Sequence, residues 1–106
     1  MGISEIKQIS GNGIHGVTNT FASALWALDI TMEYAAMGGF FINFFNPLTP
    51  SNQSFFGAGP LFEPAPIYYG VLFAIWTLRN QPYIHKVPIV AGFSSNIKVY
   101  GMDDWW

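Results

Sequence analysis

Residues 2–45 read GISEIKQISGNGIHGVTNTFASALWALDITMEYAAMGGFFINFF and decide the fold class. A short apolar segment ends at Glu5, and a loop rich in glycine separates it from an apolar helix pattern. Gly38-Gly39 ends that pattern, and the aromatic run Phe40–Phe45 follows. A short continuous apolar run between such flanks is typical of a buried strand in a parallel sheet. The order strand, loop, helix, strand therefore predicts a βαβ unit.

The predicted helix covers residues 19–37, where Thr18, Asn19 and Thr20 offer capping oxygens at its start. Its large apolar side chains recur at three- and four-residue spacing, which predicts one buried face. They are Phe21, Leu25, Leu28 and Met32. Asp29 and Glu33 are four residues apart and share another face, which we interpret as solvated or paired with a neighbouring helix.

The second half of the chain changes its pattern twice. A loop over residues 46–66 contains five prolines, and its last proline, Pro66, suits the first position of a helix predicted over residues 67–79. Beyond Asn80 the apolar period becomes two, which predicts strands over residues 85–90 and 95–100 in an antiparallel pair.

Composition separates this chain from an ordinary small soluble domain. Of its 106 residues, 51% are hydrophobic and only 9% are charged, against about 25% charged in average soluble domains. Small domains expose more surface per volume and should be more polar than average. The composition therefore favours a piece of a larger protein whose elements are buried on several sides.

Charge and cysteine content exclude several functional classes. The net charge is −2 and the four basic residues are scattered, so nucleic acid has no electrostatic footprint here. The chain has no cysteine, which excludes disulfides, thiolate metal sites and cysteine nucleophiles. His15 and His85 are isolated from each other, and no metal site or cofactor is predicted.

A membrane interpretation is the main rival to a soluble one. The longest apolar stretch, Phe21 to Phe45, contains Asp29, Glu33 and Asn43 and is broken by Gly38-Gly39. Acids in the middle of a spanning helix are costly, and each half of the stretch is too short to span. A membrane-associated hairpin of the two apolar helices is therefore an alternative that the sequence disfavours.

Glu5 is the candidate catalytic residue. A carboxylate at the carboxyl end of a strand, before a βα loop, occupies the place where (β/α)₈ barrels keep their catalytic groups. Taken alone, Glu5 is more often an exposed structural glutamate, and its position raises the functional interpretation without making it the commoner one.

The ordered segments together resemble glycoside hydrolase family 79, the heparanase and β-glucuronidase-like enzymes. The resemblance rests on Glu5, Ser10-Gly11-Asn12-Gly13, Thr18-Asn19-Thr20-Phe21-Ala22, Leu25-Trp26-Ala27-Leu28-Asp29 and FEPAPIYYGVLF at residues 62–73. It implies an α/β fold in which residues 1–80 form the last two βα units of a (β/α)₈ (TIM) barrel. It also implies that residues 81–106 are short antiparallel strands that begin a C-terminal β-sandwich-like module.

By this resemblance Glu5 is the catalytic nucleophile of a retaining glycosidase and Asn43 is a substrate-binding residue. The implied substrates are uronic-acid-containing glycans or glycosides with O-glycosidic bonds, in a secreted or lysosomal setting, with no cofactor. The chain departs from the family at Ile6-Lys7, where many members have Thr-Asn or Thr-Ser. The barrel segment that carries the partner acid/base glutamate is missing, so we expect the isolated chain to be inactive. A non-catalytic carbohydrate-binding or pseudo-enzyme fragment is the alternative.

Overall fold

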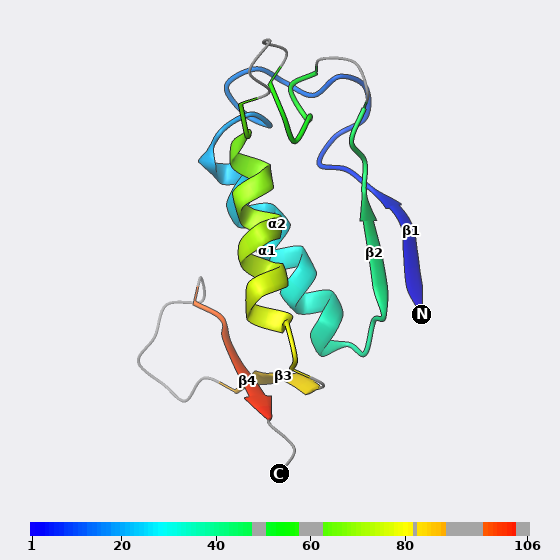
Figure 1. Cartoon of the computed structure of the whole chain (residues 1–106), viewed down its shortest axis with the longest axis vertical. Helices are drawn as coiled ribbons and strands as arrows, with labels where there is room; N and C mark the ends of the chain where they lie inside the picture. Colours follow the sequence, from blue (N-terminus) through cyan, green and yellow to red (C-terminus); the bar gives the residue numbers. More distant parts are fainter. Residues whose placement is uncertain (48–50, 58–62, 82, 89–96, 104–106) are drawn as a thin grey trace.

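The computed structural model describes residues 1–47, 51–57, 63–81, 83–88 and 97–103. Its elements run in the order β–α–β–α–β–β (Figure 1). They are β1 (Gly2–Ile6), α1 (Phe21–Ala36), β2 (Phe41–Phe44), α2 (Pro66–Leu78), β3 (Tyr83–Val87) and β4 (Val99–Asp103).

The first three elements form the predicted βαβ unit. β1 and β2 are neighbours in a parallel two-stranded sheet, and α1 connects them. The glycines 38 and 39 separate α1 from β2 as expected, and Pro66 occupies the start of α2. The mixed α/β class and both helices are therefore confirmed, with bounds that differ from the predicted ones by one or two residues.

α1 and α2 lie side by side on one side of this sheet (Figure 1). Small residues make the contact between the two helices: Ala24 and Ala27 of α1 and Ala74 of α2 are buried. At Gly70 an added Cβ would overlap the backbone of Ala24, so only glycine permits this approach. The core between the helices is consequently thin, and the largest side chain with almost no exposure is that of Ser23.

The predicted buried face of α1 is wrong for most of its length. Phe21 is 70% exposed and Leu25 is 52% exposed, and of the predicted stripe only Met32 is buried. The helix instead turns its small side chains toward α2, since these allow close approach. Leu25, Leu28 and Met32 instead line an open hollow together with Phe73 of α2 and Tyr100 of β4.

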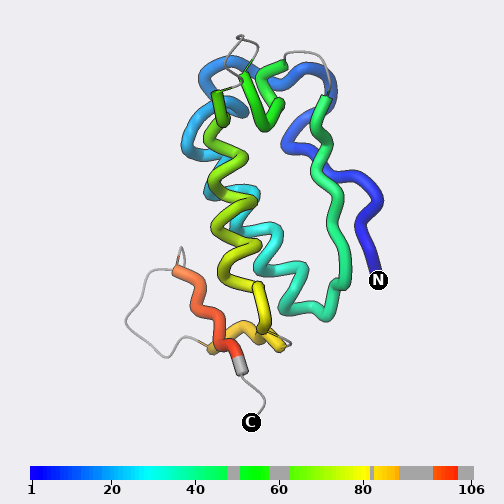
Figure 2. Tube along the Cα trace, viewed as in Figure 1, coloured from blue at the N-terminus to red at the C-terminus, as the bar shows by residue number. Residues whose placement is uncertain are grey.

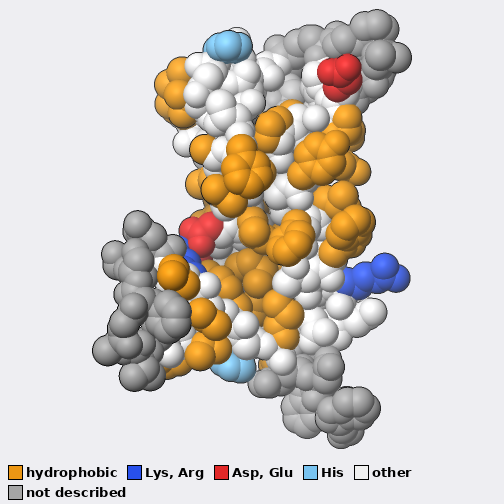
Figure 3. All heavy atoms as spheres, turned by 90° about the vertical axis from the view of Figure 1, so that its left-hand side faces the viewer, with side chains coloured by type: hydrophobic (Ala, Val, Ile, Leu, Met, Phe, Trp, Pro, Cys, Tyr) orange, Lys and Arg blue, Asp and Glu red, His pale blue; other side chains and the backbone are white. Residues whose placement is uncertain are grey.

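Exposed apolar side chains gather along the helical pair, on the face shown in Figure 3. The large ones on the two helices are Phe21, Leu25, Tyr69, Phe73, Ile75 and Trp76. Contiguous apolar patches of this kind normally mark surfaces that other protein covers. The arrangement agrees with the composition, which favours elements buried on several sides.

The last two strands, β3 and β4, form a separate antiparallel pair (Figure 1). The antiparallel arrangement is confirmed, whereas the predicted bounds of 85–90 and 95–100 are displaced. β3 ends at Val87 because the next residue, Pro88, has no N–H to donate to a ladder. Its partner continues to Asp103, which pairs with Tyr83. Residues 89–96, which include parts of both predicted strands, lie outside the described residues.

Candidate functional site

The sheet carries an irregularity between Ile3 and Ile6, the stretch of β1 that contains Glu5. Ile3 pairs with Ile42 and Ile6 pairs with Phe44, so three steps on β1 match two on β2. Such a register shift is typical of a β-bulge, a feature that re-aims side chains and is common beside active sites. The side-chain nitrogen of Asn43 donates a hydrogen bond of 3.3 Å to the carbonyl oxygen of Ser4. The two sequence-predicted site residues are thus brought to adjacent positions on neighbouring strands.

Asn43 faces away from the helices. The rings of Phe44 and Trp26 of α1 lie 5.8 Å apart, which fixes the helix-facing side of β2. Asn43 is the adjacent residue on β2, and side chains alternate along a strand. Asn43 and Glu5 are both exposed. In the part of the chain that the structure describes, no helix covers this second face (Figure 1).

Glu5 has one charged neighbour. The Lys7 ammonium lies 3.1 Å from its carboxylate, whose side chain is 56% exposed. The same ammonium lies 4.9 Å from the centre of the Phe45 ring, which follows β2. The Phe45 N–H donates a 2.7 Å hydrogen bond to the Ile6 carbonyl. A carboxylate, a cation and an aromatic ring therefore meet at the carboxyl ends of the two parallel strands.

Two long loops lie at that same end of the sheet (Figure 2). One precedes α1 and the other precedes α2, and Gln53 fastens them together. Its side-chain nitrogen donates a 2.8 Å hydrogen bond to the Gly11 carbonyl, and its oxygen accepts from the Ile9 N–H at 3.4 Å. Gln53 is only 2% exposed. A buried amide with both ends bonded fixes the position of the loops above the strand ends.

Thr18 makes a second link between the loops. Its hydroxyl donates to the Asn52 carbonyl at 2.9 Å and accepts from the Ile14 N–H at 2.9 Å. Gly13 has a φ of +77°, and an added Cβ there would overlap the side chains of Thr18 and Gln53. The glycine is therefore required both by its backbone conformation and by this contact.

The predicted capping role of residues 18–20 is wrong in detail. Thr20 is the N-cap residue of α1 but its side chain makes no capping bond. Its hydroxyl donates to the Val17 carbonyl instead, and the Asn19 side chain accepts from the Gly16 N–H. The side chains of Thr20 and Asn19 therefore bond to backbone groups of the loop in place of the free N–H groups at the helix end.

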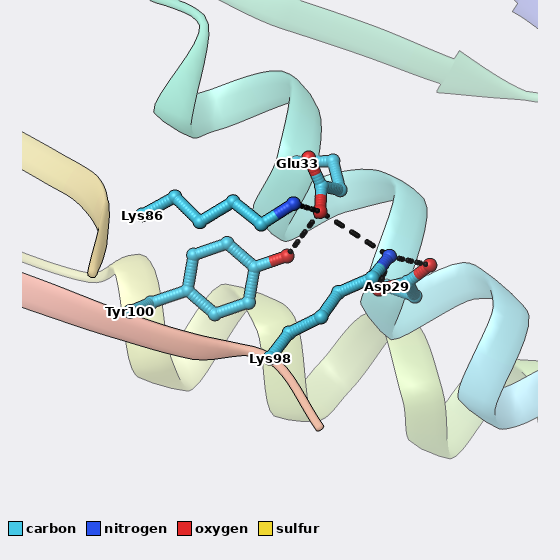
Figure 4. Close-up of polar contacts among 5 residues, drawn as sticks. All are labelled: Asp29, Glu33, Lys86, Lys98 and Tyr100. Carbon is cyan, nitrogen blue, oxygen red and sulfur yellow. Dashed lines mark hydrogen bonds and ion pairs between the residues drawn. The ribbon is translucent and has the colours of Figure 1, made fainter. Parts of the chain in front are cut away.

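Asp29 and Glu33 belong to a second cluster, shown in Figure 4. The Lys98 ammonium lies 2.7 Å from Asp29 and 3.2 Å from Glu33. Lys86 lies 2.8 Å from Glu33, and the Tyr100 hydroxyl donates to the same carboxylate at 3.0 Å. The predicted partner for these acids was solvent or a helix, but the structure gives them the β3–β4 pair. We call these five residues the hairpin latch.

Charge pairing shifts the ionisation of the hairpin latch. Hydrogen bonds from Lys86, then Lys98 and Tyr100, lower the pKa of Glu33 from 4.5 to about 2. Burial, with the hydrogen bond to Glu33, raises the pKa of Tyr100 from 10.0 to about 12. The pairing with Asp29 raises the pKa of Lys98. With its carboxylates committed to lysines, this cluster serves to dock the strands on α1 and does not resemble a catalytic pair.

Sequence reasoning missed Gln53, Thr18 and the role of Lys7. Gln53 and Thr18 form contacts across more than 30 residues of chain, and no local pattern announces such contacts. The one available indication was that Gln53 lies in a proline-rich loop that carries aromatic side chains, a composition that favours an ordered loop over a disordered one.

Within the described residues, no group of three or more histidine, aspartate or glutamate side chains could hold a metal ion. None of the described helices is long and apolar enough to cross a membrane. Comparison with protein-family models, curated proteins and solved structures finds no match to this chain. The resemblance to glycoside hydrolase family 79 therefore stays a prediction that rests on the quoted residues.

Replacing Gln53 should loosen the two loops. Gln53→Leu removes both hydrogen bonds and leaves the Gly11 carbonyl without its donor, which should cost about 1–3 kcal/mol. We expect amide hydrogen exchange in residues 9–13 and 51–54 to accelerate by roughly tenfold to a hundredfold.

The matched control is Gln8→Leu, because the buried side-chain oxygen of Gln8 has no hydrogen-bond partner among the described residues. Equal acceleration in both variants, or none in Gln53→Leu, would contradict the assignment of Gln53 as the fastener.

The hairpin latch should weaken in acid. Because the folded state lowers the pKa of Glu33, the group stabilises folding fully above pH 4.5 and loses that contribution as the pH falls toward 2. Exchange protection of the β4 amides, corrected for intrinsic rates, should stay level from neutral pH to about 5 and then decline.

Glu33→Gln should lower that protection near neutral pH and flatten its decline in acid. Glu63→Gln is the control, since Glu63 joins no ion pair in the described part of the chain. An unchanged acid profile in Glu33→Gln would show that other carboxylates cause the decline.

Proposed function

We propose that this chain carries the nucleophile half of a retaining glycoside hydrolase site, in the last two βα units of a (β/α)₈ barrel. Glu5 is the nucleophile, and the bonds cleaved are O-glycosidic bonds of glucuronide or glycosaminoglycan type. The observation that carries the proposal is the placement of Glu5: the carboxyl end of a parallel strand, at a bulge, beneath two long fastened loops. Catalytic groups of (β/α)₈ barrels occupy this position.

The bare face of the β1–β2 sheet supports the barrel interpretation. Parallel sheets occur almost only with both faces covered, and a two-stranded sheet is too small to be stable by itself. Further parallel strands at both edges would place Phe41 and Asn43 on the inside of a barrel and leave α1 and α2 in its outer ring. The exposed apolar side chains of the helices would then be covered in part by neighbouring helices.

The chemistry requires two carboxyl groups about 5 Å apart. The Glu5 carboxylate would attack the anomeric carbon while a partner carboxylic acid protonates the departing glycosidic oxygen. The same partner, now a carboxylate, would then take a proton from the water that hydrolyses the glycosyl–Glu5 ester. Lys7 balances the charge of the attacking carboxylate, and Asn43 lies beside it to meet a sugar hydroxyl.

Among the residues that the structure describes, Glu5 is the one carboxylate near the ends of β1 and β2. The two acids of α1, Asp29 and Glu33, are bound to lysines in the hairpin latch. General acid catalysis is worth about 10²–10⁴-fold. The proposed activity therefore belongs to the intact protein that contains this chain, and the chain alone should be inactive.

The test uses the full-length protein and a 2-fluoro glucuronyl fluoride, which traps the covalent intermediate. We expect peptide mapping to find the label on Glu5, and we expect Glu5→Gln to abolish turnover of an aryl glucuronide while the circular dichroism spectrum stays unchanged. Glu63→Gln, an exposed loop acid, is the matched control and should retain activity.

Labelling of a different carboxylate, or near-normal turnover by Glu5→Gln, would remove Glu5 from the mechanism. Sugar binding by the full-length protein without any turnover would select the alternative, a non-catalytic carbohydrate-binding protein.

A further inference from the structure

Lys7 is the basic residue beside Glu5, and balancing the charge of that carboxylate uses only part of its ammonium. It follows β1 directly, with its ammonium 3.1 Å from the Glu5 carboxylate and 4.9 Å from the centre of the Phe45 ring. The aromatic ring attracts the cation electrostatically. Glu5 of β1 and Phe45, which follows β2, thus hold one ammonium at the strand ends.

The ammonium is only partly used by these neighbours. A lysine ammonium has three hydrogen-bond donors, and one is directed at Glu5. In the described part of the chain, no other acceptor contacts this nitrogen. The Lys7 side chain is 35% exposed. At least one donor therefore remains for a molecule that approaches Glu5 from the bare side of the sheet.

The other basic residues of the described chain are placed elsewhere. Lys86 and Lys98 bind the acids of the hairpin latch. Arg79 follows the last residue of α2, at the end of the helix far from the two loops (Figure 1). Lys7 is thus the described cation next to Glu5.

Charge explains what such a cation would do for a ligand. A negatively charged group that came next to an ionised Glu5 would be repelled, because like charges at short range disfavour each other. A cation in contact with both compensates the repulsion. In one sugar residue, the anomeric carbon and an anionic substituent are carried by the same ring and are therefore close together. When Glu5 contacts the anomeric carbon, an ammonium beside Glu5 is within reach of that substituent.

We propose that Lys7 determines specificity by binding an anionic group, carboxylate or sulfate, of the sugar residue that Glu5 attacks. The inference rests on the proposed function for the location of the sugar, but it concerns recognition and can be measured without turnover. It also gives a reason for the departure at Ile6-Lys7 from the pattern that the chain otherwise resembles.

The experiment measures equilibrium binding to the full-length protein with three probes that share one ring. They are methyl β-D-glucuronide, methyl β-D-glucoside 6-sulfate and methyl β-D-glucoside. We expect at least one anionic probe to bind more tightly than the neutral one. Lys7→Gln should weaken that anionic probe by roughly 10- to 100-fold, as expected for loss of a hydrogen bond to a charged group, and leave the neutral probe unchanged.

Two further variants sharpen the result. Lys7→Arg keeps the charge and should retain most of the preference, whereas Arg79→Gln, the control for loss of a distant charge, should change nothing. Glu5→Gln should tighten binding of the anionic probe, because it releases the ammonium from its ion pair and removes the repelling carboxylate.

The outcomes separate this inference from the proposed function. An anionic preference that disappears in Lys7→Gln supports the inference even if Glu5 is never labelled. A preference that survives in Lys7→Gln, equal losses for charged and neutral probes, or no anionic preference at all would overturn it. The labelling of Glu5 would stand in each of those cases.

Discussion

The structure depends on one constraint: a parallel sheet must be covered on both faces. β1 and β2 are parallel and adjacent, and the described helices, α1 and α2, lie on one side of them. Among the described residues, no further strand pairs with either edge and no helix lies on the second face, a condition that parallel sheets in stable proteins avoid. The apolar composition and the exposed large side chains of the helices follow from the same fact, since each element is built for burial on more sides than the described chain supplies.

That constraint also locates the candidate site. Because the open face and the carboxyl ends of the strands meet at Glu5, any ligand that enters along this edge encounters the bulge, Asn43 and Lys7 together. The loops above are fastened to each other by Gln53 and Thr18, so the rim of the site is held by buried hydrogen bonds. The hairpin latch lies on another side of α1. It joins β3 and β4 to the helix and is separate from the chemistry proposed for Glu5.

Local pattern predicted the elements well. Glycine and proline restrict or release the backbone directly, so the glycine pair at 38–39 and the proline at 66 mark the ends of elements in the sequence. The change of apolar period after Asn80 marks the change from helix to strand. The packing of one element against another was predicted less well. The stripe of Phe21 and Leu25 suggested a buried face, but the choice of face was made by small residues and by Gly70 on the partner helix. The spacing of apolar residues within one helix gives no information about the residues of the helix that packs against it.

Contacts between distant residues account for the rest of the difference. The link between Gln53 and Gly11 and the pairing of Glu33 with Lys86 join segments far apart in the chain, and neither residue type nor spacing specifies them. The position of Glu5 was predicted because it depends only on where one strand ends. Its neighbours Lys7 and Phe45 needed the parallel pairing to be known.

The most direct measurement is the nucleotide sequence upstream of the codon for Met1 in the native transcript. The account predicts an open reading frame, continuous with this chain, that encodes the six further βα units of an eight-unit barrel, with an Asn-Glu pair at the end of the fourth strand. An in-frame stop directly upstream, or an upstream frame without that alternation of strands and helices, would contradict the claim that β1 and β2 belong to a larger barrel.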